Sequence, residues 1–199
     1  MPYDSNPDPY IDFETGTLKN LLGLKTTEEL EAAEADITAA AIASVSDEPA
    51  LGNFDLEHLR NIHWELFKAI YDWAGEIRTV EISKGSTRFA NADAIETAAT
   101  ALFEDLHNEK LLVGLARDQY VRRLAYYYSE VNVLHPFREG NGRTERAFFS
   151  QLAATAGYRI AWRQIDADEN IRVCTLAYEG DEEPLARMLD GLLEERVDS

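Results

Sequence analysis

Cysteine and long apolar runs are almost missing from this chain of 199 residues. The one cysteine, Cys174, cannot form a disulfide within the chain, and such usage is typical of a reducing compartment. Residues 1–20 carry Asp4, Asp8, Asp12 and Glu14 but no apolar run, so the sequence offers neither a signal peptide nor a membrane-spanning segment. We therefore expect a cytoplasmic protein that does not bind a membrane.

Basic residues are scarce as well. The chain has 19 Lys and Arg against 37 Asp and Glu, a formal net charge of −18 at pH 7. Nucleic acids are bound through basic patches, so we expect no direct contact with nucleic acid. His58 and His63 are five residues apart and fall on different faces of a helix, and His107 has no ligand-like neighbour. The sequence therefore predicts no zinc site.

No linker, repeat or low-complexity run divides the chain, so we expect one domain over residues 1–199, with a helical extension at about 8–50 and a core at about 51–191. Apolar residues recur at helical spacing in six stretches: 27–43, 55–73, 93–107, 120–134, 143–156 and 168–195, the last with a break at Gly180. Trp64, Trp73 and Trp162 are expected in the core. The predicted fold class is an all-α helical bundle with one short β-hairpin.

The segment 134–146, Leu-His-Pro-Phe-Arg-Glu-Gly-Asn-Gly-Arg-Thr-Glu-Arg, has the composition of an anion site. The proline after His135 disfavours the α conformation there, so the preceding helix should end at this residue. Gly140 and Gly142 permit backbone conformations that residues with a Cβ avoid, and successive amides in such a turn form a concave anion site. A helix starting at about Arg143 would add its free N–H groups and its dipole.

The charged residues of the segment complete a nucleotide site. Arg143 and Arg146 lie one helical turn apart and can reach the same anion. Glu139 is a hard oxygen ligand of the kind that Mg²⁺ prefers, and His135 is the side chain that can take a proton near neutral pH. This set indicates transfer of a phosphate-containing group to a hydroxyl. A plain helix stop would leave the Gly-Asn-Gly turn unexplained, and no P-loop sequence occurs.

The segment matches HPFx(D/E)GNGRxxR at every defined position and so resembles the signature of the Fic family. The resemblance implies a protein adenylyltransferase that moves AMP from ATP to a Tyr, Ser or Thr hydroxyl, with His135 as base and Glu139 as ligand of Mg²⁺ or Mn²⁺. It implies a buried loop anchor at Phe137, and phosphate binding by Gly140, Asn141, Gly142, Arg143 and Arg146. The related Doc kinases carry Lys in place of Gly142 and transfer the γ-phosphate, so the glycine favours AMP transfer.

A hairpin is predicted over residues 77–90, where Val80 and Ile82 alternate with polar residues before a Lys-Gly-Ser turn. On its own it could be merely structural. Beside the motif it resembles the Fic flap, which binds the target as an added strand. The target-docking residues are then Thr79, Val80, Glu81, Ile82, Ser83, Lys84 and Gly85.

The N-terminal stretch, with Asp8-Pro9-Tyr10, residues 16–20 and Leu22-Gly23, resembles the opening of toxin-type Fic proteins. These are silenced by a small antitoxin, whose inhibitory helix carries (S/T)xxxE(G/N) and directs its Glu to the second motif arginine. The resemblance implies such an antitoxin as partner. It also implies a protein target, for which DNA gyrase and topoisomerase IV are the candidates.

Three alternatives stay open. The first is a Doc-like phosphotransferase, and the second is a catalytically silent interaction module. The third is a self-inhibited enzyme, because the stretch 175–180 satisfies the antitoxin pattern with Glu179 as its glutamate. The same stretch could instead begin an ordinary junction between two helices at 180–185.

Overall fold

The computed structural model describes residues 8–84 and 87–195, and within them the chain is a helical bundle. Its α-helices are α1 (Thr27–Asp47), α2 (Leu56–Phe67), α3 (Ile95–Asn108), α4 (Arg117–Leu134), α5 (Asn141–Thr155), α6 (Ala167–Tyr178) and α7 (Glu183–Leu192). Short 3-10 turns lie at η1 (Ala92–Ala94), η2 (Lys110–Leu112) and η3 (Trp162–Gln164). Two antiparallel pairs add β1 (Ser83–Lys84) with β2 (Thr87–Arg88), and β3 (Tyr158–Ile160) with β4 (Leu193–Glu195). The predicted all-α class is confirmed.

Local sequence explains where the helices begin and end. Thr26 caps α1 by accepting from the Glu29 N–H, and Asp55 caps α2 by accepting from the His58 N–H at 2.8 Å. Helix α4 ends at Leu134, as expected from Pro136, which disfavours helical angles at the residue before it. That residue, His135, has left-handed angles of φ 43° and ψ 60°. Gly157, two residues after the end of α5, also has a left-handed conformation, with φ 85°.

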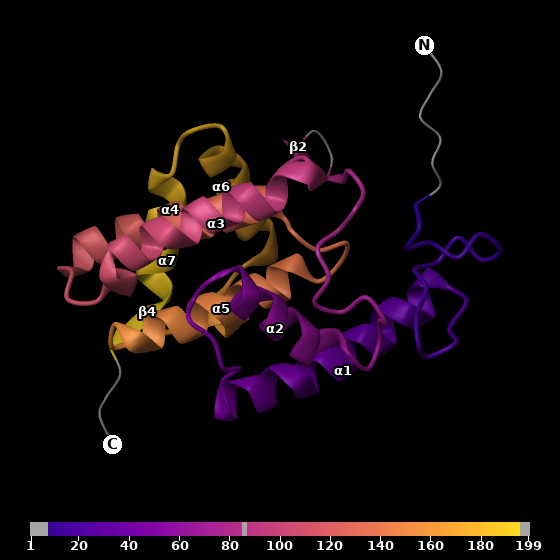
Figure 1. Cartoon of the computed structure of the whole chain (residues 1–199). Helices are drawn as coiled ribbons and strands as arrows, with labels where there is room; N and C mark the ends of the chain where they lie inside the picture. Colours follow the sequence, from indigo (N-terminus) through magenta and orange to yellow (C-terminus); the bar gives the residue numbers. More distant parts are fainter. Residues whose placement is uncertain (1–7, 85–86, 196–199) are drawn as a thin grey trace, which may run out of the picture.

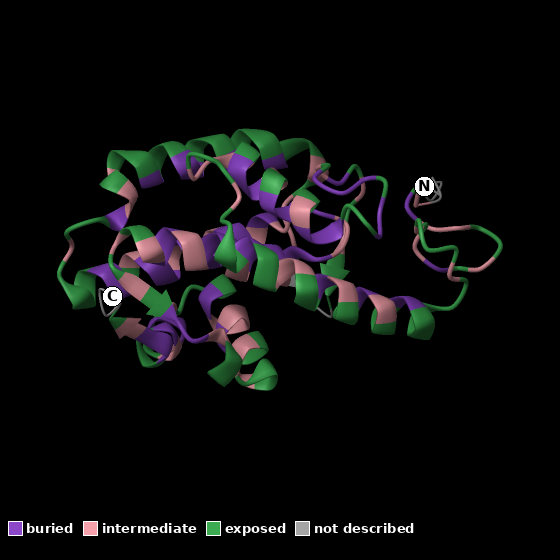
Figure 2. Ribbon diagram, turned by 90° about the horizontal axis from the view of Figure 1, so that it is seen from below, coloured by how far each residue is buried: buried purple, intermediate pink, exposed green. Residues whose placement is uncertain are grey.

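The bundle places α5 against α2 and α4, with α1 across α2 and α5, and α7 against α4 and α6 (Figure 1). Buried residues gather on the inward faces of the helices, and α1 carries a narrow buried stripe among exposed residues (Figure 2). That stripe includes Glu34 and Thr38, which are polar. No helix within the described residues combines the length and apolar character needed to cross a bilayer.

Two expectations about this part of the fold were wrong in detail. Helix α2 stops at Phe67 instead of continuing to Trp73. Beyond Phe67 the chain turns back, and the Gly75 N–H donates to His63 Nδ1 at 2.7 Å. The apolar residues Ile70 and Trp73 are still buried, but from this turn and not from the helix. Trp64 is 47% exposed at the surface of α2, so it is not a core residue.

The C-terminal region was predicted to be helical over 168–195 with a break at Gly180; the break lies between α6 and α7 as expected, but the helix does not continue to Glu195. Helix α7 ends at Leu192, and residues 193–195 form β4. This strand pairs with β3, in the register Tyr158↔Glu195, Arg159↔Glu194 and Ile160↔Leu193. The pairing joins the residues after α5 to the end of the bundle. A three-residue strand is too short to leave a periodic signal in the sequence.

Candidate active site

The N-terminus of α5 is an open set of N–H donors. Its N-cap, Gly140, has φ 80° and no side chain with which to cap the helix. Among the described residues we find no acceptor for the amides of Asn141, Gly142 and Arg143. Three unpaired amides and the positive end of a 15-residue helix favour an anion at this point.

The two glycines of this turn are present for different reasons. A Cβ on Gly140 would lie 2.2 Å from Phe67 Cζ, so both the positive φ and the close packing require glycine. Gly142 has no positive φ, and a Cβ there would meet only Arg146 Nη1 at 3.4 Å. The expectation that both glycines have special backbone angles therefore holds for Gly140 alone. At Gly142 the missing side chain instead leaves space beside Arg146.

Asn141 closes the loop before α5. Its Oδ1 accepts from the Phe137 N–H at 2.9 Å, and its Nδ2 donates to the Phe137 carbonyl at 2.7 Å. Both ends of the side-chain amide are thereby engaged by Phe137, and the backbone N–H of Asn141 is free for a phosphate. Phe137 is 1% exposed and stacks on His63 with ring centroids 3.9 Å apart. The contacts of Phe137 with Asn141 and His63 therefore fix the conformation of the loop before α5.

His63 fixes the loop from α2. Its Nδ1 accepts from the Gly75 N–H, so the ring proton is on Nε2, which donates to the Glu139 carbonyl at 3.0 Å. Burial lowers the pKa of His63 to about 3, so the ring is neutral. His63 is thus a core histidine with both ring nitrogens satisfied.

His135 has one free ring nitrogen. Its Nδ1 lies 3.1 Å from the Asn132 carbonyl, which can only accept, so Nδ1 carries the proton and the Nε2 lone pair is available. The ring stacks on Phe89 with centroids 3.7 Å apart and planes 14° apart. Burial lowers the pKa of His135 to about 4, which keeps the imidazole neutral and able to accept a proton at pH 7.

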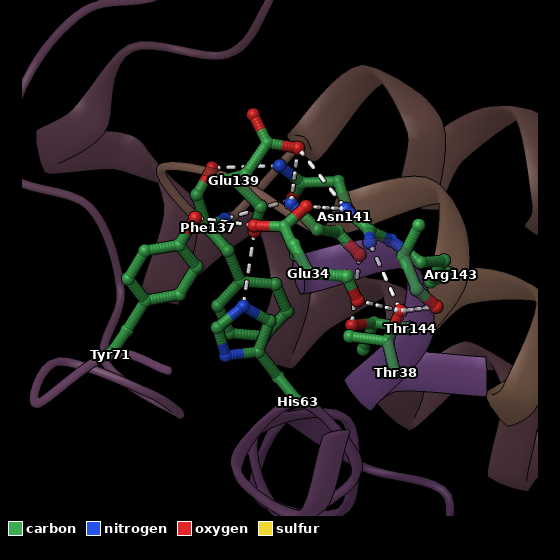
Figure 3. A network of polar contacts seen from close by, with 11 residues as sticks. Glu34, Thr38, His63, Tyr71, Phe137, Glu139, Asn141, Arg143 and Thr144 are labelled. Carbon is green, nitrogen blue, oxygen red and sulfur yellow. Dashed lines mark hydrogen bonds and ion pairs between the residues drawn. The ribbon is translucent and has the colours of Figure 1, made fainter. Parts of the chain in front are cut away.

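The two arginines of the motif have different surroundings. Arg143 donates from Nη2 to Glu34 Oε1 and from Nη1 to Thr38 Oγ1 at 3.1 Å, both on α1 (Figure 3). Its Nη2 also lies 3.6 Å from Glu139 Oε1. Arg146 forms no ion pair with any residue that the structure describes. Of the two, Arg146 is the guanidinium with its charge uncompensated.

Glu139 is a reasonable ligand for a divalent cation. Its side chain is 44% exposed, and its Oε1 accepts from the Gly140 N–H at 2.8 Å. Within the described residues no three His, Cys, Asp or Glu side chains form a metal-binding group. A Mg²⁺ held here by one carboxylate would take its other ligands from nucleotide phosphates and water, which is how Mg²⁺ commonly binds. The residues present therefore fit such an ion.

The flap is shorter than the predicted hairpin. Pairing is confined to Ser83↔Arg88 and Lys84↔Thr87, and residues 77–82 are not in a strand. The backbone there is engaged otherwise, because the Arg78 N–H donates to the Pro136 carbonyl and the Val80 carbonyl accepts from Arg78 Nη1. Of the proposed docking residues, Gly85 lies outside the described residues. Of the other six, Thr79 to Ile82 lie in the stretch before β1, and Ser83 and Lys84 form β1.

Sequence reasoning missed Arg78. Its side chain is 1% exposed and donates to four backbone carbonyls. Two belong to the flap segment, Val80 at 2.7 Å and Ala90, and two to the end of α4, His135 at 2.8 Å and Leu134 at 3.3 Å. Arg78 therefore ties the flap to the residue that carries the free imidazole nitrogen. A single arginine next to β-branched residues gave no signal of this role.

The N-terminal segment also reaches the site. Asp8 Oδ2 accepts from Arg138 Nε at 2.8 Å, and the Tyr10 hydroxyl accepts from the Thr79 N–H at 3.2 Å. One short segment thus contacts both the motif loop and the flap. Asp8 and Tyr10 belong to the stretch that resembles toxin-type proteins, but the sequence did not indicate that they would contact the site.

The stretch 175–180 lies at the end of α6. Glu179 is exposed and serves as the C-cap of that helix. No ion pair joins Glu179 to Arg146 among the described residues. Its carboxylate is therefore not seated on the second motif arginine in this structure.

Known proteins share both the sequence and the fold. The profile of the Fic/DOC family matches residues 53–153. Protein adenylyltransferase VbhT of Bartonella schoenbuchensis is 39% identical over 187 residues, which are 94% of this chain but 39% of that longer protein. A protein named probable protein adenylyltransferase Fic from Escherichia coli is 42% identical over 161 residues, covering 81% of this chain and 80% of the relative.

Solved structures agree. The N-terminal Fic domain of a VirB-translocated Bep effector protein from Bartonella quintana, with bound ADP, superimposes with a TM-score of 0.89 at 29% identity, covering 94% of this chain and 95% of that one. The BepC protein of Bartonella tribocorum, with bound AMPPNP, gives a TM-score of 0.87 at 25% identity, with 94% and 97% covered. On this agreement of profile, relatives and fold, the chain belongs to the Fic/DOC family.

Proposed function

We propose that this chain transfers AMP from ATP to a hydroxyl side chain of a target protein, and that it acts as the toxin of a toxin–antitoxin pair. The observation that carries the proposal is the position of His135, with a free Nε2, beside the uncapped N-terminus of α5. The relatives named protein adenylyltransferase support AMP transfer as the reaction. The nucleotide-bound Fic structures support ATP as the donor.

In the proposed reaction, His135 is the general base. The target hydroxyl oxygen attacks the α-phosphorus of ATP, its proton moves to Nε2, and the bond between the α-phosphorus and the bridging oxygen to the β-phosphate breaks. The products are the AMP-modified protein and diphosphate. The Nδ1 contact with Asn132 holds the tautomer that this step needs, and stacking on Phe89 limits rotation of the ring.

The phosphates are held at the start of α5. The free amides of Asn141, Gly142 and Arg143 supply N–H donors, Gly140 supplies the open turn beside them, and Arg146 supplies a charge for the distal phosphates. Arg143 donates two of its N–H groups to Thr38 and Glu34 on α1, and its remaining N–H groups could donate to the same phosphates. Glu139 would hold a Mg²⁺ or Mn²⁺ ion, which would neutralise charge on the leaving diphosphate.

The flap would hold the target. The docking residues would be Thr79 to Lys84 together with Gly85, which lies outside the described residues, and an extended target segment could pair along them and bring its hydroxyl to His135. The antitoxin would act at the other end of the site. A Glu delivered to Arg146 would make the ion pair that a distal phosphate otherwise makes, which prevents productive ATP binding. DNA gyrase and topoisomerase IV are the proposed targets.

The test is the position of the transferred label. The purified chain is incubated with candidate target and ATP labelled either at the α- or at the γ-phosphate, with and without a partner that carries (S/T)xxxE(G/N). We expect transfer of the α-label alone, mass spectrometry that gives an AMP increment, and suppression by the partner. Transfer of the γ-label would instead establish a phosphotransferase. Absence of any increment on gyrase, topoisomerase IV or the chain itself would contradict the proposal.

A further inference from the structure

Helix α1 carries two buried polar residues, Glu34 and Thr38, and both contact Arg143. Glu34 lies outside the matched family segment 53–153, and it is 6% exposed. A buried carboxylate needs partners, and Glu34 has two: Arg143 Nη2 on one oxygen and the Tyr71 hydroxyl on the other. Thr38, one turn further along α1, donates to the Glu34 carbonyl at 2.7 Å and accepts from Arg143 at 3.1 Å.

This arrangement places one guanidinium between two carboxylates. Arg143 Nη2 contacts Glu34 Oε1 directly and lies 3.6 Å from Glu139 Oε1 (Figure 3). Glu139 lies in the loop directly before α5, four residues ahead of Arg143, so the two side chains come close at the start of the helix. The side chain of Glu34 is 8% exposed and that of Glu139 is 44% exposed. Because water screens the second pair more, the buried Glu34 holds the guanidinium.

We infer that Glu34 is a positioning residue, which retains Arg143 on α1 and so leaves the Glu139 carboxylate free for a divalent cation. If Glu34 lost its charge, the nearest anion to Arg143 would be Glu139. The guanidinium would close the 3.6 Å gap and pair with it. A metal ion would then have to displace a cation from its own ligand. This inference rests on the proposed function of Glu139, and it makes α1 a part of the nucleotide site.

The experiment compares ATP affinity in EDTA with ATP affinity in excess Mg²⁺, by calorimetry on the purified chain. The ratio of the two dissociation constants is used, because it cancels effects of a variant on ATP contacts that do not involve the metal. For Glu34→Gln we expect the Mg²⁺-dependent gain to fall on the order of fivefold, the worth of a partly exposed ion pair. The double variant Glu34→Gln with Arg143→Gln should regain the wild-type ratio, since the competing cation is gone.

Asp8→Asn is the matched control. It also removes a carboxylate of the N-terminal segment that pairs with a motif-loop arginine, Arg138, but this pair does not involve Glu139. Its ratio should equal that of the wild type. If Glu34→Gln does not fold, Glu34→Asp keeps the charge on a shorter side chain and should change the ratio in the same direction, to a smaller extent.

The outcomes separate the two levels of the argument. The inference about Glu34 would be overturned if the ratio of dissociation constants in Glu34→Gln equalled that of the wild type, or if the double variant did not regain the wild-type ratio. If Glu34→Gln does not fold, an unchanged ratio in Glu34→Asp would overturn it. In these cases the proposed role of Glu139 would stand. A wild-type chain that binds ATP without any gain from Mg²⁺ would instead contradict the proposed role of Glu139. A loss in Asp8→Asn as large as that in Glu34→Gln would mean that the effect is general to the N-terminal segment, and would also overturn the inference.

Discussion

Replacement of Arg78 by lysine should destabilise the protein and slow transfer together. Arg78 is buried and donates to four carbonyls, two on the flap segment and two at the end of α4. A lysine keeps the positive charge and part of the apolar stem. Its single ammonium cannot reproduce the planar fork of the guanidinium, however, so we expect it to reach only two of the four carbonyls.

The size of the effect follows from the bonds that are lost. A hydrogen bond with a charged partner contributes about 1.5–3 kcal/mol, so two lost bonds cost roughly 3–4 kcal/mol if each is near the lower end. For a chain of this size, each kcal/mol lowers the melting temperature by roughly 2–4 °C, which gives a decrease on the order of 10 °C for Arg78→Lys. Transfer should fall further than stability alone explains, because Arg78 links the flap segment to the end of α4, where His135 lies, and the lysine weakens that link.

The assay is thermal unfolding followed by circular dichroism, together with transfer of labelled AMP at a temperature where both proteins remain folded. Arg122→Lys is the control, since the Arg122 side chain is 67% exposed and its Nη2 lies 3.7 Å from Asp118 Oδ2. That surface pair contributes about 0–1 kcal/mol, so the control should melt within a few degrees of the wild type. A melting temperature of Arg78→Lys within about 2 °C of the control would correspond to a loss of at most about one kcal/mol. That result would refute the reasoning about the four carbonyls.

Four further predictions concern the chemistry. His135→Ala should lower transfer by roughly 10²- to 10⁴-fold while ATP affinity, measured by calorimetry, stays close to that of the wild type. EDTA should abolish transfer, and Glu139→Ala should do the same in the presence of Mg²⁺; full activity in EDTA would exclude a metal. Burial lowers the pKa of His135 from 6.5 to about 4, so the folded state binds this proton less readily than the unfolded state. The contribution of this histidine to stability is therefore complete above pH 6.5 and is lost as the pH falls toward about 4. Urea unfolding at a series of pH values should therefore show a falling free energy of unfolding across that window, less steep in His135→Ala, and transfer by the free enzyme should have its acid limb well below pH 6.5. Glu179→Gly should leave transfer without a partner nearly unchanged, whereas strong activation would establish self-inhibition.

The signature could be interpreted from sequence because its chemistry is local. The proline after His135, the glycine at Gly140 and the helix that follows act on neighbours within a few residues, so the C-terminal end of α4 and the turn before α5 were predictable. The six helical stretches were visible for the same reason, since each has its own periodicity. Where the prediction went wrong, as in α2 beyond Phe67, contacts from distant residues set the backbone.

The supporting residues of the site were not predictable because their partners are remote in sequence. Glu34 and Arg143 are 109 residues apart, and Asp8 and Arg138 are 130 apart. A glutamate in the middle of a helix such as α1 ordinarily faces solvent, and nothing in its neighbours marks it as buried. The position of Arg78 is comparable, because its four acceptors are backbone carbonyls, which any sequence has.

The contacts of Asp8 and Tyr10 bear on how relatives of this protein diverge. The family profile begins at residue 53, so two members can be indistinguishable within it and still differ in what holds the catalytic loop and the flap. Selection could then change the rate of modification, or the choice of target, through residues that no comparison of the signature would register. The segment upstream of residue 53 thus offers evolution a way to alter a site whose reacting groups stay the same.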